Sequence, residues 1–202
     1  MRIEVIERSQ RQHWQEPLRR AFALRHQAFV DGYGWEFLRR PDGLDVDQHD
    51  AGDATHVLAL DGETVGGHLR LIPGGYLVVS RADPVRLRQA TGDAALFGLS
   101  RLCIDPAIGR RDMILFWLAT AAFDRALSYG AGALLFDTDP RMVMLMRLLG
   151  LPVVKVGEAV PAGERMMQPV VLRLASSIIE TVRRNLISRQ RGPVPAEMVC
   201  FA

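Results

Sequence analysis

The first thirty residues change from an alternating to a helical pattern of apolar positions. Residues Arg2 to Glu7 place Ile3 and Val5 between polar neighbours, which predicts a short strand with one buried face. Apolar side chains then recur every three or four residues, as they do on one face of a helix: Trp14, Leu18, Phe22 and Phe29. Arg25 falls on the same stripe. Because burying a lone charge is costly, the pattern predicts a carboxylate close to Arg25.

Residues 31–53 have no periodic pattern and are rich in Gly, Pro and Asp. A stretch of this length is more typical of a functional loop than of a simple connection. Two strand-like runs follow, Thr55–Leu60 and Thr64–Ile72, and the Asp-Gly between them predicts a hairpin. The pattern then becomes ambiguous, and we expect a short strand at Tyr76–Val79 and a helical piece at Val85–Ala90.

The second half of the chain alternates strands and helices. We expect strands at Phe97–Asp105, Ala133–Asp137 and Met166–Leu174, and helices at about Asp112–Tyr129, Pro140–Leu149 and Ser176–Ser188. This order predicts an α/β fold built in layers rather than an all-β or all-helical one. We expect a single domain over residues 1–192 and a loose tail at residues 193–202.

Composition narrows the class of protein. About half of the 202 residues are apolar and about a quarter are charged, which is typical of a folded globular protein. The net charge of +2, without a basic stripe interleaved with aromatics, argues against nucleic-acid binding. Residues Met1 to Gln12 lack the apolar core of a signal peptide or membrane span, and the two cysteines are too few for a disulfide framework. We therefore expect a cytoplasmic location.

Histidine spacing gives no indication of a metal site, and none is expected. Arginine supplies nearly all of the positive charge, because Lys155 is the only lysine. Four arginine pairs occur: Arg19-Arg20, Arg39-Arg40, Arg110-Arg111 and Arg183-Arg184. Since the guanidinium group grips phosphates and carboxylates at two points, the pairs are candidates to contact a partner with phosphates or acidic helices. Ordinary solvated surface charge is the alternative for each pair.

Three carboxylates fall within six residues, at Asp45, Asp47 and Asp50. Carboxylates this close repel one another unless cations share the site. Arg25 on its helix, and Arg70 and Arg101 inside otherwise apolar strands, are the candidate cations. Such a group would receive a positively charged substrate. Two alternatives stay open, a solvated acidic loop and arginines that point outward, because the sequence does not fix strand register.

Eight residues in five separated segments occur together in a recognisable order: Arg25-x-x-x-Phe29, Trp35, Asp47-x-x-Asp50, Arg70 ahead of a proline, and Ser100-Arg101. The set resembles the LuxI-type acyl-homoserine-lactone synthases over roughly Leu24 to Gly157. The stretch from Trp35 to Gly43 looks most like the branch of that family that uses acyl- or aroyl-CoA donors. The resemblance is specific because all these positions agree together.

The resemblance implies a fold like that of the GCN5-related N-acetyltransferases, a three-layer sandwich with a mixed central sheet and a V-shaped cleft between strands. It also implies an acyltransferase that makes a quorum-sensing signal in two steps. The amine of S-adenosylmethionine attacks an acyl thioester of coenzyme A or acyl carrier protein. The carboxylate of S-adenosylmethionine then closes on the side chain of the same molecule, which gives a lactone and methylthioadenosine. S-adenosylmethionine is here a substrate, and neither step needs a metal or a cofactor.

The resemblance also implies roles for the matching residues. The expected catalytic residues are Arg25, Asp47, Asp50, Arg70 and Arg101, whose acids attract the sulfonium and ammonium charges. The expected substrate-binding residues are Phe29, Trp35, Ser100, Leu102, Thr138 and Met142. The two aromatic rings would wall the site, and the last three residues would line an acyl pocket with Ile104, Phe136 and Met146. The same pocket residues would also suit an ordinary core. The arginine pairs would contact coenzyme A or acyl carrier protein.

One position departs from the family pattern. Family members usually carry a glutamate two residues before the serine of the Ser-Arg pair, and this chain has Gly98 there. Such a glutamate is a candidate to receive the amine proton, and general-base help is typically worth about a hundredfold to ten-thousandfold. Asp45 is a conceivable substitute. The departure leaves two alternatives open, an N-acyltransferase with another amine acceptor and a catalytically silent homologue that binds S-adenosylmethionine or an acyl carrier. The sequence does not identify the acyl group, the type of donor or the oligomeric state.

Overall fold

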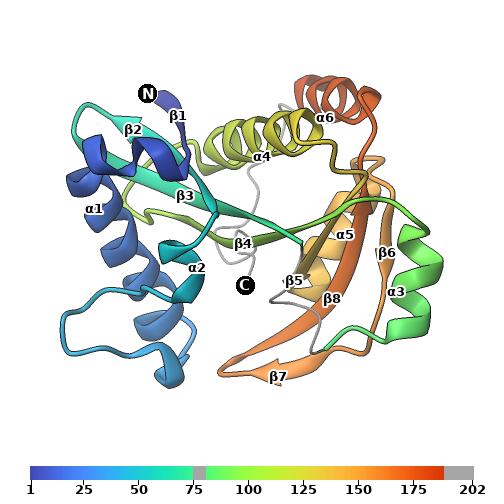
Figure 1. Ribbon diagram of the computed structural model, residues 1–202, viewed down its shortest axis with the longest axis horizontal. Helices are drawn as coiled ribbons and strands as arrows, with labels where there is room; N and C mark the ends of the chain where they lie inside the picture. Colours follow the sequence, from blue (N-terminus) through green and yellow to red (C-terminus); the bar gives the residue numbers. More distant parts are fainter. Residues whose placement is uncertain (75–80, 189–202) are drawn as a thin grey trace.

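The computed structural model describes residues 1–74 and 81–188 (Figure 1). The strand expected at Tyr76–Val79 and the tail expected at residues 193–202 lie outside the described residues. The other expected strands and helices are present. Within the described part of the chain, no helix is both long and apolar enough to cross a bilayer.

The described strands form one large mixed sheet in the order β1-β2-β3-β4-β5-β8-β6, with β7 paired to β8. The bounds are β1 (Arg2–Ile6), β2 (Thr55–Asp61), β3 (Thr64–Pro73), β4 (Leu96–Ile104), β5 (Ala133–Thr138), β6 (Val153–Lys155), β7 (Val160–Ala162) and β8 (Arg165–Arg173). Neighbouring strands run antiparallel, except that β4 and β5 run parallel. The sequence pattern missed β6 and β7 because a strand of three residues is too short to show alternation.

Helices cover both faces of the sheet and complete the expected three layers (Figure 1). One face carries α1 (Gln15–His26), α2 (Gln48–Ala51) and α3 (Pro84–Thr91), and the other carries α4 (Arg111–Ser128), α5 (Pro140–Leu148) and α6 (Ser177–Ser188). Short helical turns are η1 (Arg8–His13), the π turn η2 (Gln27–Asp31) that continues α1, and η3 (Glu36–Leu38). Alternation along β3 separates the faces, since Leu69 and Leu71 pack toward α4 while Arg70 reaches the acids of α2.

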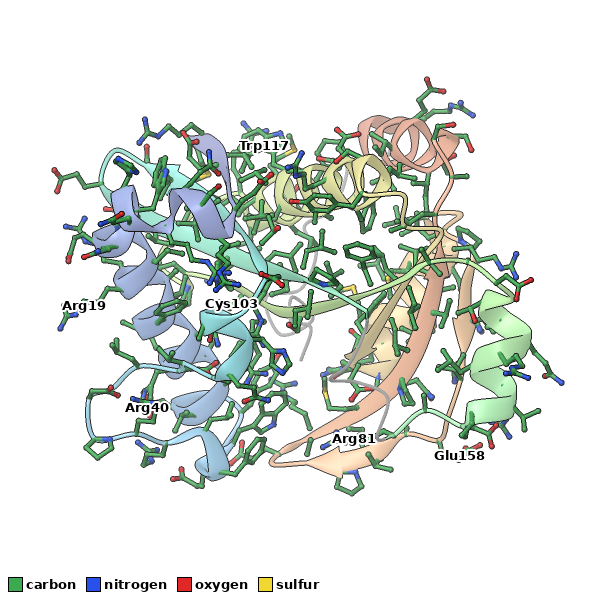
Figure 2. The ribbon with its side chains drawn as sticks, in the orientation of Figure 1. Arg19, Arg40, Arg81, Cys103, Trp117 and Glu158 are labelled. Carbon is green, nitrogen blue, oxygen red and sulfur yellow. The ribbon has the colours of Figure 1, made fainter. Side chains whose placement is uncertain are left out.

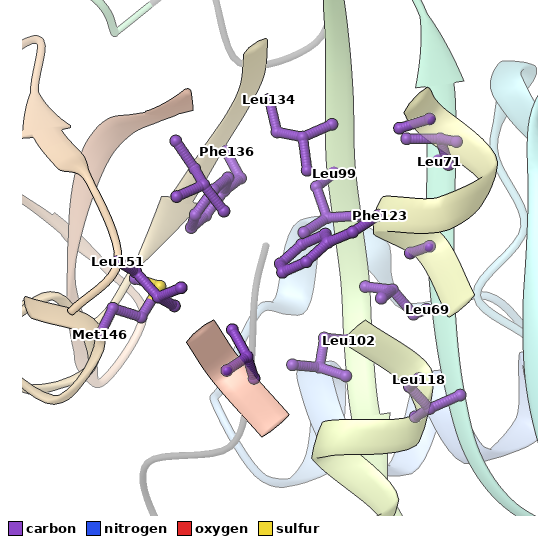
Figure 3. Close-up of a cluster of buried hydrophobic side chains, with 14 of the residues drawn as sticks. Leu69, Leu71, Leu99, Leu102, Leu118, Phe123, Leu134, Phe136, Met146 and Leu151 are labelled. Carbon is purple, nitrogen blue, oxygen red and sulfur yellow. The ribbon is translucent and has the colours of Figure 1, made fainter. Parts of the chain in front are cut away.

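The larger hydrophobic core lies between the sheet and the α4 layer (Figure 3). Leu99 of β4, Phe123 of α4 and Phe136 of β5 lie together near its centre. The buried stripe of α4 follows helical spacing: Ile114, Leu118, Ala122, Phe123 and Ala126. The opposite face of β5 is apolar where Ala133 and Leu135 pack toward α3, and polar groups come further along the strands, at Ser100 and Asp137.

The sheet opens between β4 and β5. Only Leu96–Gly98 of β4 pair with Ala133–Leu135 of β5, although both strands continue beyond these residues. Parallel neighbours normally keep an even ladder of hydrogen bonds along their whole shared length. The two strands thus stop pairing after Gly98, and this opening is of the kind that the resemblance implied, a V-shaped cleft between strands.

Candidate active site

Arg25 lies on the last turn of α1, and its guanidinium group is fully buried. Its Nε donates to Asp45 Oδ2 at 3.1 Å, and its Nη1 and Nη2 donate to the Asp50 carboxylate at 2.8 and 3.1 Å. A two-point contact of this kind fixes both partners in one plane. The prediction that a carboxylate lies beside Arg25 is confirmed.

Arg70 of β3 joins the same group from the sheet. Its Nη1 donates to Asp47 Oδ1 and to Asp50 Oδ1, both at 2.7 Å, and its Nη2 donates to Asp47 Oδ2 at 2.9 Å. Its Nε donates to Ser100 Oγ at 3.1 Å. Arg70 is fully buried, so it points inward and not to the solvent.

Arg101 of β4 completes the group from the next strand. Its Nε donates to Asp45 Oδ2 at 2.7 Å, and its Nη2 lies 3.5 Å from Asp47 Oδ2. The side chains of Arg101 and Asp47 are 12% and 17% exposed, whereas the other four charged side chains are at most 2% exposed. The balanced group of three arginines and three aspartates is therefore open to the surroundings mainly at Asp47 and Arg101.

The four-residue helix α2 presents two of these acids in a fixed geometry. His49 N–H donates to Asp47 Oδ1 at 2.9 Å, and Asp47 N–H donates to Asp50 Oδ2 at 2.8 Å. This reciprocal cap satisfies backbone donors at the start of the helix. The loop at residues 31–53 is thus organised by the carboxylates that it carries.

The arginines determine the protonation of the acids. Burial alone would raise the pKa of Asp50, but the charges of Arg25 and Arg70 overcome it and hold this pKa far below its usual range. Burial opposes the same change at Asp47, where hydrogen bonds from Arg70 and its charge lower the pKa. Both groups are carboxylates at neutral pH. They are consequently weak proton acceptors.

A bulge in β4 turns two successive side chains toward this group. Arg101 has a left-handed backbone with φ of 56°, and the register between β3 and β4 shifts between His68 and Arg70. Successive strand residues normally face opposite sides, yet Ser100 and Arg101 both contact the charged group. The shift explains why the sequence left the direction of Arg101 open.

Two buried histidines support the bulge from β2 and β3. His68 Nδ1 lies 2.9 Å from the Arg101 carbonyl oxygen, and His56 Nδ1 lies 3.1 Å from His68 Nε2. Burial lowers the pKa of His56 to about 3 and that of His68 well below its usual value, so both rings are neutral. Because a carbonyl oxygen only accepts, His68 carries its proton on Nδ1 and His56 donates to His68. The sequence had given these residues no role.

Aromatic rings close the outer side of the charged group. Phe29 of η2 lies beneath the Arg101 guanidinium, 5.4 Å from the ring centroid. Trp35 stacks on Phe29 with centroids 5.2 Å apart and donates from Nε1 to the Ala162 carbonyl oxygen of β7 at 2.8 Å. Phe29 and Trp35 thus lie beside the charged group, and Trp35 links the loop after α1 to β7, while their role as a wall around a substrate stays a prediction.

On the opposite face of the sheet, a small apolar cavity of about 60 Å³ lies beneath α4, α5 and α6. Its lining includes Leu99, Phe123, Phe136, Met142 and Met146, with further residues of the same helices. Figure 3 shows Phe136 of β5 on the same side of the sheet as Phe123 of α4. The cavity lies where the two strands stop pairing.

The expected substrate-binding residues therefore fall into two places. Ser100 contacts the charged group, and Met142 lines the cavity on the other face. Leu102 and Thr138 are fully buried but are not among the residues that line this cavity. The sequence did not distinguish pocket lining from core at these two positions.

The expected docking role of the arginine pairs stays a prediction. Arg20 binds Glu16 and Glu63, and Arg39 binds Glu36, within the chain's own surface. Arg19 points away from α1 (Figure 2). Arg110-Arg111 lies at the start of α4, where helix N–H groups favour an anion.

Two buried acids were not among the expected catalytic residues. Asp45 is almost fully buried and bridges Arg25 and Arg101. Asp137 is buried near the end of β5, with Arg81 Nη1 at 3.7 Å from its Oδ2. Their sequence signals were a third carboxylate beside the Asp47-x-x-Asp50 pair, and an acid inside an apolar strand.

Known structures define the class of fold. An acyl-CoA N-acyltransferase from Pseudomonas aeruginosa matches with a TM-score of 0.57 and 18% identity, over 86% of this chain and 99% of that one. BjaI, a CoA-dependent acyl-homoserine lactone synthase solved with SAM and isopentyl-CoA, matches with a TM-score of 0.77 and 23% identity, over 97% of this chain and 96% of that one. The fold is that of an N-acyltransferase.

Sequence comparison identifies the family. The autoinducer synthase family matches residues 9–182, so this chain belongs to that family. The acyl-homoserine-lactone synthase of Rhizobium radiobacter is 29% identical over 173 residues, which cover 81% of each chain. The isovaleryl-homoserine lactone synthase of Bradyrhizobium diazoefficiens is 44% identical over 71 residues, 35% of this chain and 32% of that protein.

Proposed function

We propose that this chain transfers an acyl group from a coenzyme A thioester to the amine of S-adenosylmethionine and then closes the lactone, releasing methylthioadenosine. The observation that carries the proposal is the buried group of three arginines and three aspartates, which is exposed only at Asp47 and Arg101. The charged group lies on the α1 face of the sheet, beside the opening between β4 and β5, and an apolar cavity lies on the α4 face.

The acceptor chemistry fits the exposed edge of the group. S-adenosylmethionine carries an ammonium, a sulfonium and a carboxylate. Asp47 offers a carboxylate to the cations, and Arg101 offers a planar donor to the carboxylate. Phe29 beneath Arg101 removes water from this edge, which strengthens each charged contact. Held in this way, the amine has already lost its freedom of position on binding, so little further entropy is lost when it attacks.

The donor chemistry fits the other side of the opening. The cavity of about 60 Å³ is far smaller than a typical ligand pocket of roughly 300–1,000 Å³, so it suits only a short acyl tail. A relative that is named for isovaleryl-homoserine lactone, whose acyl group is short, supports the same acyl length. The start of α4, with Arg110-Arg111, is the proposed contact for the coenzyme A phosphates. No metal or cofactor takes part.

The test combines S-adenosylmethionine with a series of straight and branched acyl-CoA donors, and with the same acyl groups on acyl carrier protein. Release of methylthioadenosine is followed over time, and the lactone is identified by mass spectrometry. We expect product from short acyl-CoA donors and at least about a hundredfold loss of kcat/KM in Asp47→Asn. Glu158→Gln, at an exposed ion pair, is the matched control. Methylthioadenosine without lactone, or no product from any donor, would contradict the proposal.

A further inference from the structure

Asp137 is a buried acid that the proposed mechanism has not yet used. It is 7% exposed on β5, and its Oδ1 has no hydrogen-bond partner among the residues that the structure describes. Its Oδ2 lies 3.7 Å from Arg81 Nη1, beyond hydrogen-bond distance. Buried carboxylates are normally satisfied by donors. An acid left in this state invites a functional explanation.

The sheet register places Asp137 at the opening between β4 and β5. Gly98 aligns with Leu135, the last pair before the strands separate. Two residues further along each strand come Ser100 and Asp137, on the same face as Gly98 and Leu135 because strand side chains alternate. Ser100 contacts Arg70 of the charged group. Asp137, on the β5 side of the opening, therefore faces that group across it.

The other nearby acids are poor proton acceptors. Asp47 and Asp50 have lowered pKa values because arginines hold them as carboxylates, and Asp45 is bound by two arginines. On this face of β4, Gly98 has no side chain that could accept a proton. An amine that attacks a thioester must still lose a proton. These contacts therefore favour a proton acceptor outside the charged group.

The geometry points to Asp137 as the general base of acyl transfer, an inference that rests on the proposed function. The neutral amine attacks the thioester carbonyl carbon, a C–N bond forms, and the nitrogen gives a proton to Asp137. The C–S bond breaks with its electron pair on sulfur. Asp137 returns the proton to the departing thiolate, so the products are an amide and a free thiol.

The surroundings of Asp137 favour this role near neutral pH. Burial raises its pKa to about 6, and the charge of Arg81 opposes that rise only in part. From β8, Asp137 faces Pro169 and its neighbour Gln168, neither of which titrates. From β4 it faces Ser100. Among the described residues, Arg81 is the charged group that acts on this carboxyl.

The experiment compares wild type, Asp137→Asn and Asp139→Asn with S-adenosylmethionine and the best acyl-CoA donor. We expect Asp137→Asn to lower kcat by about a hundredfold to ten-thousandfold while the KM for S-adenosylmethionine changes less than threefold. The wild-type rate should fall as pH drops below about 6, and this limb should be absent in the variant. Asp139→Asn keeps an oxygen to cap α5 and should match wild type.

Chemical rescue separates proton transfer from a structural role. Formate should restore part of the activity of Asp137→Ala, and should not do so for Asp47→Ala. An Asp137→Asn enzyme within threefold of wild type, or one that is slow with an unchanged acid limb, would overturn the inference. If wild type makes lactone in those cases, the proposed function stands and only the role of Asp137 falls. If wild type itself makes no lactone, the proposed function fails, and the inference fails with it.

Discussion

The two faces of the sheet solve the problem of recognition in opposite ways. On the α1 face, six charged side chains close on one another with nearly every polar atom paired. On the α4 face, the cavity exposes only apolar surface. A buried ion pair is strongly destabilised when one partner changes, whereas an apolar lining tolerates substitutions that alter its shape. Under the proposed function, the amine acceptor should therefore be fixed and the acyl donor variable.

The largest effect is expected on the charged face. Arg25→Leu removes one of the two arginines that hold each of Asp45 and Asp50 and leaves a net negative charge buried, so the free energy of unfolding should fall by about 3–5 kcal/mol. Urea unfolding at pH 7 measures the change. Arg39→Leu, at an exposed ion pair, should leave the urea midpoint unchanged. Equal effects of the two substitutions would remove the distinction between the buried group and surface charge.

A smaller effect is expected on the apolar face. Met146→Ala enlarges the cavity and should cost about 2–5 kcal/mol of unfolding free energy. It should also shift donor preference toward longer acyl-CoA, at an unchanged KM for S-adenosylmethionine. Met144→Ala on the same helix is the control, because Met144 is 59% exposed. A changed KM for S-adenosylmethionine with no change in donor preference would mean that the two faces are not separate.

Asp137 lies on the charged face beside the opening between β4 and β5, and its burial should limit stability. Its pKa is raised to about 6 in the folded chain, so the folded chain keeps a proton that the unfolded chain loses near pH 4. That contribution to stability is complete below pH 4 and is lost as pH rises through 6. Asp137→Asn should therefore stabilise the chain by about 2–3 kcal/mol at pH 8 and hardly at pH 4. Thermal melts at pH 4 and pH 8 measure this gain in stability, and a gain that does not depend on pH would contradict the raised pKa of Asp137.

The smallest effect is expected at the bulge. His68→Leu removes the donor to the Arg101 carbonyl oxygen and should cost about 1–3 kcal/mol. It should also raise the KM for S-adenosylmethionine, because Arg101 is released from its fixed backbone. His68→Asn keeps an N–H near the same position and should recover part of both losses. Equal behaviour of the two variants would show that this hydrogen bond does not hold Arg101.

The charged face was predictable where a buried charge needs an oppositely charged partner. Arg25 on an apolar helix stripe required an acid, and the cluster at Asp45–Asp50 supplied two. Arg101 was not predictable in direction, because the left-handed residue in β4 breaks strand alternation and no local signal announces it. Asp137 was missed because its importance depends on the strands parting after Gly98, which is a property of the sheet and not of either strand.

The apolar face was predictable as an element pattern but not as a pocket. The strand at β5 and the helix at α5 follow from their periodicity. Met142 lines the cavity while Leu102 and Thr138 are buried away from it, although all three sit in similar apolar contexts. A cavity forms where side chains from neighbouring layers leave space unfilled, and the sequence alone does not show where this happens.

The order of the site residues along the chain has a further consequence. The six charged residues all come from positions 25–101, whereas the cavity is lined by Leu99 and by residues 112–182. Under the proposed function, one crossover in the connection between β4 and α4 therefore exchanges nearly all of the acyl half of the site and leaves the acceptor half intact. Recombination among relatives would then change the signal molecule in a single event, without rebuilding the charged network.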